Sequence, residues 1–125
     1  VPHVGWDQMH LTPAGQTSAL LAGVAEGANV YFTHSYALDD DCDPSIVLAR
    51  THYVRSFPCI VGTGNIYGCQ FHPEKSSVLG LEMLANFAAI VRTSNAYGGA
   101  PMIVFPAIDL IGGKVVRLER GDRSV

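Results

Sequence analysis

A Gly-rich break divides the chain into two units of different composition. Residues 95–101 are small, polar and rich in glycine, the composition of a linker, and Met102 follows them directly. Before the break four basic residues stand against eight acidic ones, and after it four stand against three. The sequence therefore predicts a first unit over residues 1–94, a linker over residues 95–101 and a second unit over residues 102–125. Because the chain starts with Val1 rather than Met, we expect it to be a piece of a longer protein.

The first unit is predicted to contain short strands followed by one helix. Three segments are rich in aromatic and β-branched residues and are bounded by turn residues, which is typical of strands. They are residues 30–33, 46–48 and 59–61. From Ser77 onward the period changes, since Leu84, Phe87, Ala88 and Val91 recur at helical spacing, with Ser76 or Ser77 placed to cap the helix. The pattern predicts an amphipathic helix packed on a sheet.

The segment from Gln70 to Glu74 carries the chemistry of the first unit. A strand runs into His72, Pro73 prevents it from continuing, and Glu74 lies two residues on, just before the helix. A thiol nucleophile needs an imidazole to take its proton, and the imidazole needs a carboxylate to fix its orientation. His72 and Glu74 suit these two roles. The alternative is a surface histidine beside a helix-capping acid.

The string Gln70-Phe71-His72-Pro73-Glu74 resembles the signature of the triad-type glutamine amidotransferases, a family with a doubly wound α/β fold. Three further segments, residues 1–8, 31–36 and 74–76, narrow the resemblance to the glutaminase subunits of imidazole glycerol phosphate synthase, in histidine biosynthesis. The resemblance covers residues 1 to about 92, roughly the last half of such a subunit. One departure is that Asp7 stands where the family usually shows Asn.

The resemblance implies further roles toward glutamine and toward a partner. Ser35 and Tyr36 match positions whose backbone helps to hold the glutamine carboxylate; the alternative is a strand end with a buried tyrosine. Trp6, Tyr31 and Lys75 match the face that docks the cyclase barrel subunit, to which ammonia is handed over. For Trp6 the alternative is a place in the core.

The nucleophilic cysteine of this family is missing from the sequence. The family places it in a G-x-C-x-G turn between a strand and a helix, and an upstream Gly-rich loop helps to form the oxyanion hole; neither occurs here. Cys42 lies in an acidic loop, Cys59 follows a proline, and Cys69 is inside the strand that leads to His72. We therefore expect all three to be structural and the chain to be unable to hydrolyse glutamine alone.

The second unit opens with an apolar run, residues 103–108, that ends in Asp109. The first strand of a parallel barrel delivers an acid or base in this way, although an acid after a strand is otherwise a turn residue. We expect residues 115–118 to form a strand that returns along residues 103–108 after a turn at Gly112-Gly113. Without more barrel strands, we expect this hairpin to pack loosely, if at all, on the first unit.

The opening of this unit resembles the isomerase that acts on phosphoribosyl-formimino-AICAR phosphate, a (β/α)8 barrel. The resemblance implies that Asp109 is a catalytic acid or base and that Arg117 meets a substrate phosphate. Only about 24 residues of the barrel are present, so it cannot close. The joined units are either a fragment of a natural bifunctional fusion or a read through adjacent genes, and Met102 favours the second slightly.

Composition excludes several other classes of function. The net charge is −3 with scattered basic residues, which argues against nucleic acid as a partner. No apolar run is long enough to cross a bilayer, and the N-terminus has no charged segment leading into an apolar run, as a signal peptide would. Three cysteines without CxxC spacing indicate a reducing, cytoplasmic setting, and neither the cysteines nor His3, His10, His34 and His52 are spaced as metal ligands, so we expect no metal or cofactor. Two alternatives to an enzyme piece remain: a non-catalytic module that docks the cyclase barrel, and a chain that does not fold stably.

Overall fold

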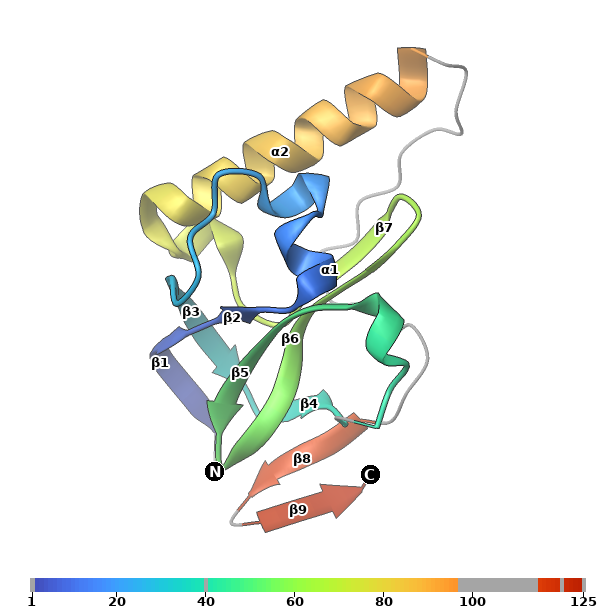
Figure 1. Cartoon of the computed structure of the whole chain (residues 1–125). Helices are drawn as coiled ribbons and strands as arrows, with labels where there is room; N and C mark the ends of the chain where they lie inside the picture. The colour runs from blue at the N-terminus through green and yellow to red at the C-terminus, as the bar shows by residue number, and fades with distance from the viewer. Residues whose placement is uncertain (1, 40, 97–114, 120, 125) are drawn as a thin grey trace.

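The computed structural model describes residues 2–39, 41–96, 115–119 and 121–124 (Figure 1). Two α-helices and nine strands follow one another along these ranges, with three short 3-10 helices between them. The α-helices are α1 (Pro13–Gln16) and α2 (Ser77–Ala96), and the 3-10 helices are Ala19–Leu21, Pro44–Ile46 and Pro73–Lys75. The strands are β1 (His3–Gln8), β2 (His10–Leu11), β3 (Asn29–His34), β4 (Tyr36–Leu38), β5 (Val47–Tyr53), β6 (Arg55–Thr63), β7 (Ile66–Cys69), β8 (Val115–Glu119) and β9 (Gly121–Ser124).

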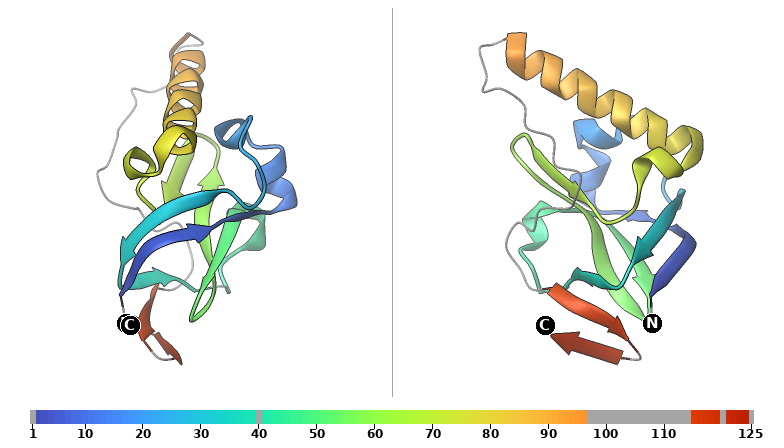
Figure 2. Two further views of the ribbon diagram at one scale, coloured as in Figure 1. Left: turned by 90° about the vertical axis from the view of Figure 1, so that its left-hand side faces the viewer. Right: turned by 180° about the vertical axis from the view of Figure 1, so that it is seen from behind.

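The strands form three antiparallel sheets. Strands β1 and β3 pair as a two-stranded ribbon that runs alongside the larger sheet β2-β5-β6-β7, and β4, β8 and β9 form the third sheet (Figure 2). An α/β fold that carries a long helix after its last large-sheet strand is therefore confirmed. Every strand pair within the described ranges is antiparallel, so these ranges hold no parallel pair of the kind that a doubly wound sheet contains.

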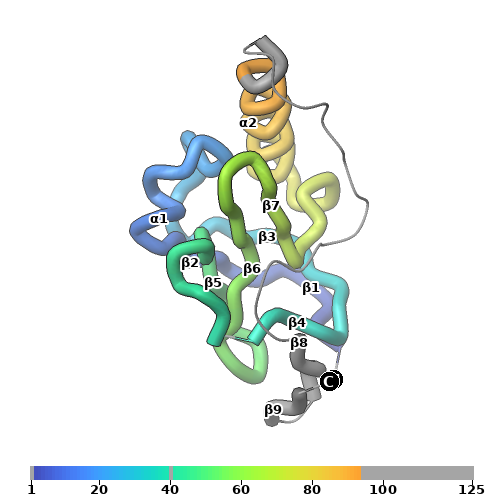
Figure 3. Tube along the Cα trace, turned by 90° about the vertical axis from the view of Figure 1, so that its right-hand side faces the viewer, coloured from blue at the N-terminus to red at the C-terminus, as the bar shows by residue number. Residues whose placement is uncertain are grey.

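The main core lies between the strands and α2. Val30 and Phe32 alternate along β3 and are fully buried there, as the two-residue period of a strand requires. In β6 all of residues 57–61 are buried, and Phe57 and Ile60 both belong to this core. Strand β7 extends toward α2 (Figure 3). The ring of Tyr67 meets that of Phe87 there edge to face, with centroids 6.2 Å apart. Helix α2 is also tied to the Ala19–Leu21 turn, because the Asn86 side-chain amide donates to the carbonyls of Leu20 and Ala22, each at 2.9 Å.

Most of the strand predictions are confirmed. Residues 30–33 lie within β3 and residues 59–61 within β6. Of residues 46–48, Ile46 ends the Pro44–Ile46 3-10 helix and the strand starts at Val47. The side chain of Asp43 accepts a hydrogen bond from the Ser45 N–H at 2.9 Å, which stabilises that short helix and delays the strand by one residue.

Helix α2 begins where predicted, and its buried face agrees only in part with the predicted one. Leu84 is 41% exposed, whereas Met83 beside it is 2% exposed and packs in the core. The buried side consists of Leu79, Met83, Phe87 and Ile90. The predicted face is confirmed for Phe87 and wrong for Leu84, because apolar residues occur all round this helix and the sequence contains two overlapping patterns of the same period.

The ends of α2 also differ from expectation. The Ser76 carbonyl accepts the first helical bond, from Gly80 N–H, but the Ser76 hydroxyl bonds elsewhere, and Ser77 adopts a positive φ of 61°. Neither serine is therefore the predicted side-chain cap. At the other end the helix continues through Ala96, two residues into the segment expected to be linker, and residues 97–101 lie outside the described residues.

Strand β8 covers the predicted segment 115–118, but its pairing differs from the prediction. It lies between β4 and β9, with Val116 opposite Ala37 on one side and Ser124 on the other. A strand has only two hydrogen-bonding edges, and at Val116 and Arg117 both are occupied by β4 and β9. These two residues therefore do not form the predicted pairing with residues 103–108. Strand β8 extends the edge of β4, so this strand of the second unit pairs with the first unit, and the expectation of loose packing stays a prediction. Residues 103–108, Gly112-Gly113 and Asp109 themselves lie outside the described residues. No helix within the described ranges is long and apolar enough to cross a membrane.

Candidate functional site

The turn that carries His72 is held by main-chain hydrogen bonds. The His72 N–H donates to the Tyr31 carbonyl of β3 at 3.0 Å, and the His72 carbonyl accepts from the Lys75 N–H at 3.0 Å. Pro73 starts the Pro73–Lys75 3-10 helix, where a residue without an N–H is tolerated. The junction predicted from the sequence is present, and it is attached to β3 as well as to β7.

Ser76 joins this turn to β3 a second time. Its hydroxyl donates to the His72 carbonyl at 2.7 Å and accepts from the Tyr31 N–H at 3.0 Å, and the residue is completely buried. The helix that follows lies close to the turn, since a side chain at Gly80 would collide with the Pro73 carbonyl oxygen. Sequence reasoning identified Ser76 only as a possible helix cap, so its role in fixing His72 was missed.

The structure brings His72 and Glu74 together. The His72 Nδ1 and Glu74 Oε1 atoms are 3.4 Å apart, with the side chains 42% and 59% exposed. With the carboxylate on the Nδ1 side, Nε2 is left to accept a proton from another group. The separation is longer than a charge-assisted hydrogen bond, so the contact orients the ring only loosely.

Burial affects the reactivity of the cysteines. Burial raises the pKa of the Cys69 thiol to about 12, and the neighbouring Glu74 carboxylate adds to this shift. Burial also raises the pKa of the Cys59 thiol far above its ordinary value. Cys42 is buried as well, and none of the three cysteines is in a disulfide. Since the thiolate is the reactive form, Cys59 and Cys69 are unsuited to attack at neutral pH.

Ser35 lies between β3 and β4, and Tyr36 is the first residue of β4. The Tyr36 carbonyl accepts a hydrogen bond from His34 Nδ1 at 2.9 Å, so the short segment from His34 to Tyr36 is closed on itself. Tyr36 is 42% exposed, which excludes the alternative of a buried tyrosine. In the register of β4 and β8 Tyr36 stands opposite Arg117, so both residues predicted to touch substrates are in adjacent strands.

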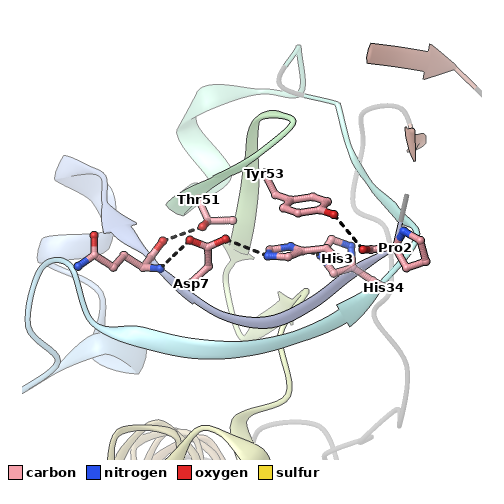
Figure 4. A network of polar contacts seen from close by, with 7 residues as sticks. Pro2, His3, Asp7, His34, Thr51 and Tyr53 are labelled. Atoms are coloured by element: carbon pink, nitrogen blue, oxygen red, sulfur yellow. Dashed lines mark hydrogen bonds and ion pairs between the residues drawn. The ribbon is translucent and has the colours of Figure 1, made fainter. Parts of the chain in front are cut away.

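His3, His34 and Asp7 form a polar network that sequence reasoning missed (Figure 4). His3 Nδ1 is 2.9 Å from His34 Nε2, and His3 Nε2 is 3.0 Å from Asp7 Oδ2. The His3 ring is buried and stacked between Phe32 and Tyr53, with centroids 4.4 Å and 4.1 Å away. These histidines were expected to be structural or exposed. The available signal was that His3 and Asp7, four residues apart, share one face of a strand.

Burial governs the ionisation of both rings. It lowers the pKa of His34 to about 4, against the opposing hydrogen bond to the Tyr36 carbonyl, and positive charge on His3 or His72 would lower it further. It also lowers the pKa of His3, where the hydrogen bond and the charge of Asp7 oppose it. At neutral pH His34 is therefore uncharged.

Trp6 and Tyr31 stand opposite each other on the outward face of the β1–β3 ribbon. Their rings meet edge to face with centroids 5.8 Å apart, and Trp6 is 54% exposed, as is Val4 at 60% on the same strand face. Trp6 is therefore not a core residue. Lys75 is exposed in the turn after His72, which contacts β3. Within the described ranges no group of three His, Cys, Asp or Glu side chains is arranged to hold a metal ion.

Comparison with known proteins identifies the family. Residues 2–91 match the family described as glutamine amidotransferase class-I. Among curated proteins, the imidazole glycerol phosphate synthase subunit HisH of Halalkalibacterium halodurans is 50% identical over 92 residues, which is 74% of this chain and 41% of that relative. The same subunit of Chromobacterium violaceum is 46% identical over 89 residues, 71% of this chain and 40% of that relative.

A third relative, from a Geobacillus species, is 46% identical over 92 residues, which is 74% of this chain and 41% of that subunit. The chain thus spans about two fifths of the length of these curated relatives. It belongs to the class-I glutamine amidotransferase family.

Proposed function

We propose that residues 1–94 are part of the glutaminase that hydrolyses glutamine and supplies ammonia to imidazole glycerol phosphate synthase in histidine biosynthesis. The contact between His72 and Glu74, at a turn fixed by Tyr31 and Ser76, is the observation that carries the proposal. The similarity to HisH subunits supports this choice among the amidotransferases. Three cysteines outside disulfides suit the reducing cytoplasm in which we place this glutaminase.

In the proposed reaction His72 takes the proton of a nucleophilic thiol through Nε2 and later gives it to the departing ammonia. Glu74 holds the ring from the Nδ1 side, and the backbone of Ser35 and Tyr36 binds the substrate carboxylate. The thiol itself has to come from residues outside this sequence, because Cys59 and Cys69 have raised pKa values and no cysteine stands in a G-x-C-x-G turn. The chain alone is therefore expected to be inactive.

Substitution at the triad tests this proposal in a subunit completed by the missing N-terminal half. His72→Ala is expected to lower glutaminase turnover by orders of magnitude, and Glu74→Ala somewhat less, because triad members act as a unit and the orienting acid is often the smaller loss. His52→Ala, which removes an exposed imidazole of β5, is the matched control and should retain activity. Wild-type turnover in His72→Ala would refute the triad assignment.

The patch of Trp6, Tyr31 and Lys75 is the proposed docking face for the cyclase barrel subunit. An exposed tryptophan packed against a tyrosine is the kind of aromatic anchor that contributes most to protein interfaces. The same patch favours the second candidate, a non-catalytic module that docks the cyclase. Binding of the purified cyclase subunit by this inactive chain would support that module, and a completed subunit that hydrolyses glutamine without binding cyclase would exclude it.

For residues 102–125 we propose the start of the phosphoribosylformimino-AICAR phosphate isomerase, with Asp109 as acid or base and Arg117 toward a substrate phosphate. The opening sequence supports this assignment. The reading frame of the surrounding locus tests it. A frame that stays open from a complete glutaminase into a complete barrel would mark a natural fusion, and a frame that ends without further barrel strands would count against an isomerase.

A further inference from the structure

Three hydrogen-bonding contacts connect Asp7 to the backbone of Tyr36. Asp7 Oδ2 meets His3 Nε2 at 3.0 Å, His3 Nδ1 meets His34 Nε2 at 2.9 Å, and His34 Nδ1 meets the Tyr36 carbonyl at 2.9 Å. The contacts join the inward face of β1 to the His34–Tyr36 segment of β3 and β4 (Figure 4). We call Asp7, His3 and His34 the relay.

The number of protons on the two imidazole rings decides how many of the three contacts can be hydrogen bonds. The carboxylate at one end and the carbonyl at the other can only accept, so three contacts need three protons on the two rings. Two neutral imidazoles carry two protons between them. When both rings are neutral, one of the three contacts therefore has no proton, and two lone pairs face each other there. This holds for every choice of tautomers. A third proton on the rings allows all three contacts to be hydrogen bonds.

Asp7 is the cause of this shortage. An asparagine at this position would place an amide N–H where Oδ2 stands, and that group would donate to His3 Nε2. The relay would then be complete with both histidines neutral. The carboxylate removes that donor and adds a negative charge next to a buried ring, so this chain can complete the relay only by binding a proton.

The third proton belongs on His3. His34 resists protonation, since burial takes its pKa to about 4 and it faces both His3 and His72. His3 faces Asp7 on its own strand and His34 on β3, while its ring faces are covered by Phe32 and Tyr53, whose hydroxyl donates to the Pro2 carbonyl. Burial lowers the pKa of His3 and Asp7 opposes this, which puts the uptake on the acid side of neutrality.

We propose that the relay is a proton-binding positioning device, in which a second proton on His3, held by Asp7, completes the chain of hydrogen bonds that fixes the Tyr36 carbonyl. This inference rests on the proposed function. Its consequence is that His3 and His34 act through the backbone of Ser35 and Tyr36 to set the affinity for glutamine. Affinity for glutamine then depends on pH in this chain, and Asp7 is the residue responsible.

The first arm of the test uses the 125-residue chain and needs no activity. Nitrogen-15 NMR of the imidazole rings, recorded from pH 8 to pH 4.5, is expected to show His3 protonated on both nitrogens at acidic pH while His34 keeps one proton, on Nδ1. In Asp7→Asn the pKa of His3 should fall by about one to two units, roughly a ten- to hundredfold loss of proton affinity. Glu82→Gln removes one charge from the exposed side of α2 and should leave His3 unchanged.

An unchanged His3 titration in Asp7→Asn, or a His34 that protonates before His3, would overturn the relay. If Asp7→Asn fails to fold, the order of protonation in the wild type decides alone. The second arm measures KM and kcat for glutamine against pH in the completed subunit. The pH dependence of KM should flatten in Asp7→Asn with little change in the kcat profile.

A flat wild-type KM would refute the link to substrate while the NMR result stands. A completed subunit without any glutaminase activity would instead refute the proposed function and the link to glutamine together. The NMR arm would still decide whether the relay binds the proton, so the two failures can be told apart.

Discussion

At the scale of single residues, Ser76 does more for the site than its size suggests. Ser76→Ala would leave the buried Tyr31 N–H without its partner and remove one of two donors to the His72 carbonyl. Stranding a buried donor costs about 1–3 kcal/mol, and we expect urea denaturation to record a loss in that range.

Thr93→Ala is the matched control for Ser76. The Thr93 hydroxyl also donates to a main-chain carbonyl, that of Ala89 at 3.0 Å, but the residue is exposed near the end of α2. Its removal should change stability by less than about 0.5 kcal/mol. Equal losses of unfolding free energy in the two variants would mean that the hydrogen bonds of Ser76 stabilise the fold no more than an exposed hydrogen bond does.

The same scale shows which parts of the site were accessible from sequence. His72 and Glu74 are two residues apart at a strand end, so their meeting follows from local geometry and was predicted. His3 and His34 are 31 residues apart, and they meet only because the β1–β3 register sets them opposite each other. Register depends on tertiary packing, which no local pattern in this sequence specifies.

At the scale of elements, the two faces of α2 can be told apart by paired substitutions. Met83 is buried against the core and Leu84 beside it is exposed. Met83→Ala should lower the free energy of unfolding by about 2–5 kcal/mol, since it removes buried methylene groups and leaves a cavity. Leu84→Ala should cost less than about 0.5 kcal/mol, because it raises helix propensity slightly and removes little buried surface. The reverse order would restore the helix face expected from the sequence pattern.

Composition predicted where strands form better than it predicted which strands pair. β3 and β6 were found because aromatic and β-branched residues are concentrated in them and turn residues bound them. The partners of residues 115–118 were not predicted. Strand β8 has two hydrogen-bonding edges that any compatible strand can occupy, and β4 and β9 occupy them. Local composition thus predicts that a strand forms, but it does not predict which strands pair with it.

For the whole molecule, the buried relay links stability to pH. His34 has a pKa of about 4 in the folded protein and 6.5 as its ordinary value, so between these limits the unfolded chain binds more protons. Stability should therefore fall as the pH falls from 6.5 toward 4, by on the order of 2 kcal/mol once partial solvent screening is allowed for. Urea midpoints at pH 7, 6 and 5 measure this slope. His34→Gln should reduce it, and an undiminished slope in that variant would assign the effect to other groups.

The close approach of Gly80 to Pro73 has a consequence for how such a sequence can change over time. The helix meets the His72 turn through main chain, with no side chain between them, and Gly80 N–H bonds the Ser76 carbonyl at 3.1 Å. The position of the imidazole is thus set by a contact that substitutions elsewhere on α2 do not touch. Residues along the rest of the helix can therefore change, with gains or losses of stability, without disturbing this contact, as long as position 80 carries no side chain.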